Sequence, residues 1–129
     1  MDHALDESGN IVAGSCTYRQ ANDDPHGSGE KSVHGYWLYV AGTCPSMANV
    51  DIELQAYWCD SLGCRWLTVA SGSGDYLAGG GSGRRSNARI NCSNSTTVGW
   101  RGATDVDLIG VADPSGWYYG GAVNRACSP

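Results

Sequence analysis

The chain has 129 residues, which suits one domain, because two cores of half that size would bury too little apolar surface to fold independently. Thirteen acidic and eight basic residues give a formal charge of −5, which disfavours phosphate backbones and anionic lipid surfaces as partners. No apolar run approaches the roughly 20 residues that cross a bilayer. We therefore expect neither nucleic-acid binding nor membrane insertion.

The six cysteines indicate an oxidising, extracellular environment, because a short chain in a reducing cytosol would carry them as reactive liabilities. The first ten residues lack the basic and apolar regions of a secretion signal, so we expect a secreted protein whose signal has been removed. Nineteen glycines, five tryptophans and seven tyrosines favour short strands and tight turns over helices.

The first 14 residues are acidic and have no strong periodicity. We expect residues 1–14 to be a flexible N-terminal arm, and residues 15–129 to be the folded domain. An arm of this kind can add a strand to a partner's sheet edge or thread a groove. The residues expected to make these protein contacts are Asp2, Leu5, Asp6, Glu7, Ile11 and Val12.

The next segments predict strands separated by an exposed loop. Cys16–Gln20 is the first strand candidate, and residues 22–29 after it are rich in turn formers. The nearly continuous apolar run Val33–Val40 predicts a strand covered on both faces. From Val50 to Trp58, apolar residues alternate with mostly polar ones, which is typical of a half-buried strand.

A hairpin is expected where Cys59–Cys64 forms a turn and Arg65–Ala70 resumes the apolar pattern. The glycine- and serine-rich segments 71–74 and 79–83 are expected to be flexible linkers. Further strand candidates are Asn87–Asn91, Val98–Arg101, Asp105–Val111 and Trp117–Val123. About eight short strands without a helical period predict an all-β chain, folded as one antiparallel, disulfide-stabilised β-sandwich.

Six cysteines allow 15 pairings, among which sequence alone does not choose. We expect the mostly local set Cys16–Cys44, Cys59–Cys64 and Cys92–Cys127, which fastens the first strands, closes the hairpin and holds the C-terminus. Each bridge would contribute about 2–4 kcal/mol, mainly by restricting the unfolded chain. Zinc is the alternative, but Cys59 and Cys64 lack a second close pair, and the histidines lie far off in sequence. Neither a metal nor a cofactor is expected.

No motif for catalysis stands out, so no catalytic residue is predicted. The Ser71–Gly74 stretch lacks the strand, sharp turn and helix of a hydrolase nucleophile elbow. His34 lies in the apolar strand candidate Val33–Val40 and is interpreted as a packing or edge residue.

Two pairs of aspartates could have either a functional or a purely structural role. Asp105 and Asp107 could divide acid and base roles in glycoside hydrolysis, but their apolar neighbours favour the wet face of a strand. On that face they would meet one of the arginines Arg84, Arg85, Arg89 and Arg101. Asp23 and Asp24 could bind calcium, although no spacing of a defined calcium loop follows.

Five motifs between Cys44 and Pro129 resemble small secreted proteins of Streptomyces and related actinobacteria. These motifs are Tyr57–Asp60, Gly63–Trp66, Gly83–Arg85, Val98–Gly102 and Asp105–Ile109. Among such proteins, the chain is most similar to the adaptor subunit of umbrella toxin particles. That adaptor joins a repeat-bearing toxin polypeptide to a lectin-containing, trypsin-like protein without protease activity. The resemblance implies an immunoglobulin-like or related β-sandwich.

The resemblance also implies a noncatalytic adaptor, whose N-terminal segment inserts into a cleft of the trypsin-like partner while its body contacts the toxin's repeats. Asp2–Gly14 is the candidate for the inserting segment. A secreted inhibitor or a carbohydrate-binding module, using exposed Trp and Tyr rings, is the alternative. A small hydrolase acting through His34, Asp105 and Asp107 is a third hypothesis.

Overall fold

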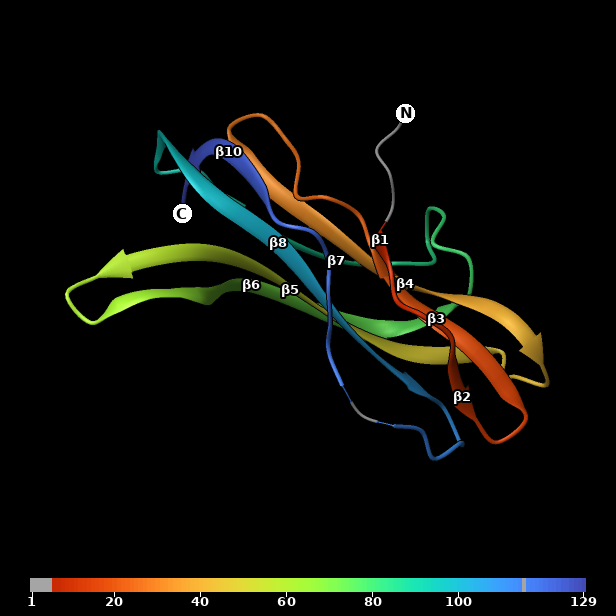
Figure 1. The fold of residues 1–129 in the computed structure, drawn as a ribbon. Coiled ribbons are helices and arrows are strands. Elements are labelled where there is room, and N and C mark those ends of the chain that lie inside the picture. The colour runs from red at the N-terminus through yellow and green to blue at the C-terminus, as the bar shows by residue number, and fades with distance from the viewer. Residues whose placement is uncertain (1–5, 115) are drawn as a thin grey trace.

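A computed structural model describes residues 6–114 and 116–129, and these residues form strands and turns without a helix. Two antiparallel sheets make a sandwich-like fold (Figure 1), as expected for a disulfide-stabilised, all-β chain. Sheet A contains β1 (Asp6–Glu7), β2 (Ile11–Ala13), β3 (Cys16–Asn22), β4 (Glu30–Gly42) and β7 (Ser86–Asn91). Sheet B contains β5 (Met47–Asp60), β6 (Gly63–Leu77), β8 (Asn94–Leu108), β9 (Tyr118–Tyr119) and β10 (Val123–Ser128).

Strand β5 lies inside sheet B, between β6 on one side and β8 on the other. Its even-numbered residues Val50, Ile52, Leu54 and Ala56 are fully buried between the sheets. The polar residues between them point to the outer face of sheet B, because successive side chains of a strand alternate. The alternation expected from the sequence is confirmed from Val50 to Ala56, whereas Trp58, which was expected on the same apolar face, is 38% exposed.

Two tryptophans anchor the two halves of the core. Trp37 of β4 packs in one apolar cluster and Trp100 of β8 in the other, and each is at most 1% exposed. Their indole N–H groups donate to backbone carbonyls, of Tyr76 at 2.8 Å and of Cys127 at 3.0 Å. Both rings are therefore buried without an unsatisfied donor.

Buried polar side chains join the two sheets where β3 passes β8. Gln20 Oε1 accepts a hydrogen bond from the backbone N–H of Val106 at 2.6 Å. Asn22 Nδ2 donates to Thr104 Oγ1 at 3.0 Å, and that hydroxyl donates to the carbonyl of Ala21 at 3.1 Å. These contacts give the sheets a fixed relative position, since a shift would leave buried polar groups unpaired.

The three expected disulfides are confirmed. Cys16–Cys44 joins the start of β3 to the segment after β4, and Cys59–Cys64 lies next to the β5–β6 turn. Cys92–Cys127 ties the connection between β7 and β8 to β10. Each bridge restricts the unfolded chain, so together they support a core that is small for its surface.

Residues 6–13 differ from the flexible arm that the sequence predicts. Strands β1 and β2 both pair with β3, and Ala13 is 4% exposed. Arg19 of β3 holds the segment through Glu7 Oε1 at 3.0 Å and Asn10 Oδ1 at 2.7 Å. Strands of two and three residues are too short to show a period in the sequence, which explains the difference.

Strand β6 also differs from expectation, because it continues through Ser71–Gly74 instead of ending in a linker. Glycine has a packing role here, since a Cβ on Gly72 would lie 2.1 Å from the carbonyl oxygen of Asn87 in β7. Likewise, the two strand candidates Val98–Arg101 and Asp105–Val111 belong to one strand, β8, which ends at Leu108. Glycines inside a strand let a neighbouring backbone come close, so a glycine-rich stretch such as Ser71–Gly74 can belong to a strand although its composition is typical of a loop.

We predict that Gly72→Ala lowers the free energy of unfolding by about 1–3 kcal/mol, because its methyl group would force β6 away from β7. Urea unfolding followed by tryptophan fluorescence measures the change. Gly81→Ala is the matched control, since a Cβ there meets nothing within 4 Å. Equal stability of the two variants would contradict this packing role.

Candidate functional site

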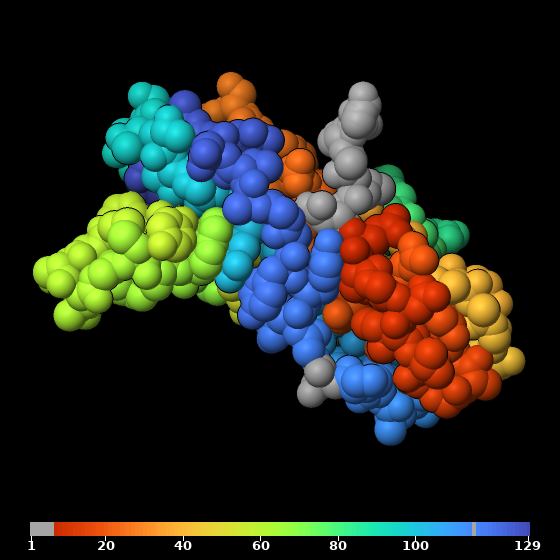
Figure 2. Space-filling view, in the orientation of Figure 1, coloured from red at the N-terminus to blue at the C-terminus, as the bar shows by residue number. Residues whose placement is uncertain are grey.

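The end of the β5–β6 hairpin, residues 57–66, extends past the rest of the two sheets (Figure 1). The same segment forms a separate lobe in the space-filling view (Figure 2). β5 and β6 stay paired up to Asp60 and Gly63, whereas β8 pairs with β5 only as far as Ala56. We call residues 57–66 the projecting hairpin.

Three interactions hold the tip of the projecting hairpin. Cys59 and Cys64 face each other in the strand register and form a disulfide. The Asp60 carboxylate accepts two hydrogen bonds from the Arg65 guanidinium, at 3.0 and 2.9 Å, and one from the Leu62 N–H at 2.8 Å. These donors, Arg65 foremost, lower the pKa of Asp60. The tip is pre-organised, so a partner need not order it on binding.

An edge-to-face aromatic pair and two cation–π contacts fix the root of the projecting hairpin on the outer face of sheet B. Tyr57 and Trp66 form a cross-strand pair with ring centroids 5.2 Å apart. The Arg101 guanidinium of β8 lies 4.3 Å from the ring centre of Trp66 and 4.3 Å from that of Tyr119. Its Nε donates to Gln55 Oε1 at 2.8 Å. Cation–π and cross-strand contacts thus couple the hairpin to β8 and β9.

Large apolar side chains are exposed on this rigid element. Leu62 at the turn is 87% exposed, Tyr57 44% and Trp58 38%. Trp, Tyr and Arg are the residue types that most often dominate binding energy in protein interfaces. The projecting hairpin therefore has the chemistry and the rigidity of a protein-binding element.

The outer face of sheet B also carries a pocket of about 500 Å³. Its side chains are two carboxylates from β5, two hydroxyls from β6 and one indole from the segment before β9. The lining residues are Asp51, Ile52, Glu53, Ser71, Gly72, Ser73 and Trp117. A few oriented polar groups beside an aromatic face suit a small polar ligand with a ring, such as a sugar.

An acidic cluster adjoins this pocket through Asp51. The register of β5 and β8 places Asp105 opposite Asp51, and the Asp107 carboxylate lies within 4.8 Å of both of theirs. The expectation that Asp105 and Asp107 face an arginine is therefore wrong. Arg101 binds Gln55 and Arg89 binds Glu30 instead. The strand register, which sequence patterns do not determine, decided this outcome.

Burial and the neighbouring charges of Asp107 and Asp51 raise the pKa of Asp105 to about 6, despite a backbone hydrogen bond from Gly116. One oxygen of Asp105, Oδ1, is buried and accepts no hydrogen bond within the described part of the chain. Burial, followed by nearby carboxylates, also raises the pKa values of Asp51 and Asp107. At neutral pH the cluster therefore crowds negative charge on the outer face.

A second cluster brings together Asp23, His26 and His34. Asp23 Oδ2 lies 2.8 Å from His34 Nδ1 and 3.2 Å from His26 Nε2, and Asp23 Oδ1 accepts the backbone N–H of His34 at 2.7 Å. Burial opposes ionisation of Asp23, but the hydrogen bonds from His34 outweigh it and lower the pKa of that carboxyl.

The sequence pattern does not predict this histidine cluster. It indicates a packing or edge role for His34, and for Asp23 only that of a calcium ligand beside Asp24. The contact follows from the β3–β4 pairing: Asn22 pairs with Gly35, and the next residue on each side brings Asp23 beside His34. A correct hairpin register would have predicted the contact.

Four of the residues predicted to contact a protein partner, those in β1 and β2, lie along one edge of sheet A. Glu7 belongs to β1, and Ile11 and Val12 belong to β2. Ile11 packs against the core, whereas Val12 is 64% exposed. Asp6 begins β1. Asp2 and Leu5 lie outside the described residues.

No protein-family model, curated protein or solved structure matches the chain. Within residues 6–114 and 116–129, no helix is long and apolar enough to cross a membrane. The projecting hairpin, the pocket and the two clusters are therefore the candidate functional features of the described residues.

We predict that Asp105→Asn raises stability by about 1 kcal/mol at pH 7.5, allowing for solvent screening of this partly exposed group. The pKa of Asp105 is about 6 in the folded chain and 3.8 as its ordinary value, so the folded state binds more protons between them. Stability from this group is present at low pH and is lost as the pH rises through 6. Urea unfolding at several pH values measures it.

The same variant at pH 4 is the internal control. At pH 4 most folded molecules of the original chain carry a protonated, uncharged Asp105, and the asparagine of the variant is uncharged too. The free energies of unfolding of the two chains should therefore nearly coincide. A variant that is less stable than the original chain at both pH values would show that the Asp105 carboxylate is not strained by its neighbours.

Proposed function

We propose that this chain is a noncatalytic, secreted adaptor that links protein components of an extracellular antibacterial toxin particle. The projecting hairpin is the observation that carries the proposal. A disulfide, a bidentate ion pair and a packed aromatic root hold its exposed Leu62, Tyr57 and Trp58 in place. Binding by such an element costs little ordering entropy, which suits a permanent assembly contact.

An adaptor needs a second surface, and the edge of sheet A supports one. β2 is an edge strand with Val12 exposed, and a partner's extended segment can add to such an edge through backbone hydrogen bonds. Residues 6–13 would have to leave β3 to insert into a cleft, so strand addition is the favoured mode for this segment.

The proposed partners follow from the resemblance of the chain to small secreted actinobacterial proteins, among which it is most similar to the umbrella-particle adaptor; Tyr57–Asp60 and Gly63–Trp66 of the hairpin are two of the five motifs that carry this resemblance. These partners are a repeat-bearing toxin polypeptide and a catalytically inactive, trypsin-like lectin protein. Secretion is part of the proposal and is supported by the three disulfides. The finer fold class, an immunoglobulin-like or related sandwich, also belongs to it and is supported by the two antiparallel sheets.

We predict that the immobilised chain captures both partner classes from the culture supernatant of its producer, identified by mass spectrometry. Leu62→Ser and Trp58→Ala should each weaken capture of one partner by about tenfold or more, because hot-spot side chains contribute at least about 2 kcal/mol. Leu77→Ser is the matched control, since Leu77 is an exposed leucine at the other end of β6. Equal capture by Leu62→Ser and Leu77→Ser, or capture of neither partner class, would refute the proposal.

A carbohydrate-binding module is the second candidate, and the pocket beside Trp117 favours it. The indole is 39% exposed, and carboxylates and hydroxyls from β5 and β6 line the same pocket. Sugars present apolar ring faces and polar edges, which match an aromatic face beside hydrogen-bonding oxygens.

For this second function we predict saturable binding on a glycan array and a loss of about tenfold in affinity on Trp117→Ala, the worth of one aromatic contact. Trp58→Ala is the matched control, because Trp58 and Trp117 are almost equally exposed, at 38% and 39%. Isothermal titration with the best glycan measures both variants. A blank array, or equal losses in the two variants, would remove the carbohydrate hypothesis.

A further inference from the structure

The histidine cluster places three potential metal-binding atoms around a common point. Asp23, His26 and His34 each offer one ligand atom, and these three atoms lie within 4.8 Å of one another. The two imidazole rings are stacked, with centroids 5.4 Å apart and planes 24° apart. The side chains come from three places: the residue after β3, the following loop, and β4.

These separations are close to those around a tetrahedral zinc ion. Zn–N and Zn–O bonds of 2.0–2.2 Å place neighbouring ligand atoms about 3.3 Å apart. The carboxylate oxygen lies 3.2 Å from His26 Nε2 and 2.8 Å from His34 Nδ1, so these two separations would widen slightly on ion binding, and the stacked rings would turn until both nitrogens point at the ion. Two rings bound to one such ion would have centroids roughly 5 Å apart, near the observed value.

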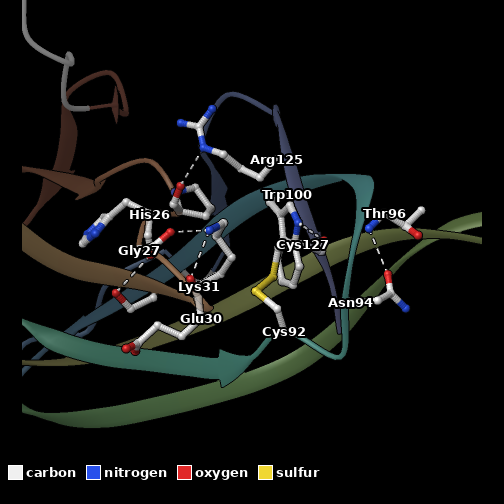
Figure 3. The surroundings of a disulfide bond; sticks show 12 residues. His26, Gly27, Glu30, Lys31, Cys92, Asn94, Thr96, Trp100, Arg125 and Cys127 are labelled. Atoms are coloured by element: carbon white, nitrogen blue, oxygen red, sulfur yellow. Dashed lines mark hydrogen bonds between the residues drawn. A yellow bond between two sulfur atoms is a disulfide. The ribbon is translucent and has the colours of Figure 1, made fainter.

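Surrounding contacts hold the loop that carries His26 (Figure 3). The Lys31 ammonium, on a residue 5% exposed, donates to the carbonyl oxygens of Gly27 at 2.5 Å and Glu30 at 3.1 Å. Arg125 Nε donates to the Pro25 carbonyl at 3.3 Å.

The backbone of His26 is fixed as well, by two hydrogen bonds to Ser32 on β4, at 3.0 and 2.8 Å. The Cys92–Cys127 disulfide lies beside this loop (Figure 3), and the N–H of Cys92 donates to the Gly29 carbonyl at 3.0 Å. The loop is therefore held before any ion arrives, as a binding site requires.

The donor types select the class of ion. Two imidazole nitrogens and one carboxylate suit zinc and its neighbours in the first transition series, whereas calcium and magnesium prefer oxygen ligands. Half of the His26 side chain is exposed, at 52%, so an ion can reach the cluster from solvent. Asp23 supplies the negative charge and is 19% exposed.

We propose that Asp23, His26 and His34 form a zinc site within a single chain. The ion binds to the ring nitrogens that face the Asp23 carboxylate, Nε2 of His26 and Nδ1 of His34, which must be unprotonated to act as ligands. A proton that lies on either of these nitrogens is released to solvent, and the neutral imidazole carries its one proton on its other nitrogen, Nδ1 of His26 or Nε2 of His34. A water molecule fills the fourth position. The site is independent of the proposed adaptor function.

Isothermal titration of the full, tag-free chain with zinc chloride tests the proposal. We expect one ion per chain, and no heat above dilution with calcium or magnesium. His26→Gln, His34→Gln and Asp23→Asn should each weaken zinc binding by at least about tenfold, because even outer-shell partners of a ligand are worth roughly 10–100-fold. His3→Gln is the matched control, since His3 is the remaining histidine of the chain.

Nitrogen-detected NMR of the imidazole rings provides a second readout, independent of stability. Zinc should shift Nε2 of His26 and Nδ1 of His34, the two atoms that face Asp23. Unfolding in the presence of EDTA checks that each variant is folded. No zinc binding, unchanged affinity in the folded His26→Gln and His34→Gln variants, coordination through the opposite ring nitrogens, or one zinc per two chains would overturn the proposal.

Discussion

The period-two alternation along β5 is the constraint on which the rest of this structure depends. Its even-numbered residues fill the core between the sheets, so its odd-numbered residues must face outward. Because β5 pairs with both β6 and β8, the same alternation determines which side chains of those strands point out. A shift of one residue would place Asp51 and Glu53 in the core, which makes the register unambiguous.

The outward face that this register creates carries two of the surfaces from which we argue function. At one end, β5 and β6 continue past the sandwich. At the root of this extension Tyr57 meets Trp66 edge to face, and Arg101 lies over the Trp66 ring. Farther along the face, the pocket beside Trp117 meets the crowded carboxylates of Asp51 and its neighbours. The protein-binding and ligand-binding proposals therefore share one scaffold, while sheet A supplies the histidine cluster.

Local patterns predicted much of the fold. The alternation of Val50–Ala56 and the hairpin closed by Cys59–Cys64 are relations between residues near in sequence. The other two disulfides join residues 28 and 35 positions apart, and the expectation of mostly local pairing was enough to predict them. The short strands of residues 6–13 were not predicted, because two or three residues are too few to show a period-two pattern. The packing role of Gly72 against Asn87 was not predicted either, because composition alone does not distinguish a packing glycine from a loop glycine.

The candidate sites were predicted less well than the fold, for a physical reason. The meeting of Asp51 with Asp105, 54 positions later, follows from the pairing of β5 with β8, and pairing register is a property of distant segments. The same holds for Asp23 and His34 across the β3–β4 hairpin. The projecting hairpin was predicted as a hairpin, but its extension beyond β8 required the length of the neighbouring strand.

Residue-resolved amide hydrogen exchange, on the chain alone and bound to its captured partner, tests the central claim that the projecting hairpin is a pre-organised protein-binding element. In the free chain, the paired amides of residues 57–59 and 64–66 should exchange slowly as a consequence of the packed aromatic root and the closed tip. In the complex, the same segment should be protected further. Rapid exchange throughout residues 57–66 in the free chain, or a footprint confined to residues 6–13, would contradict the account.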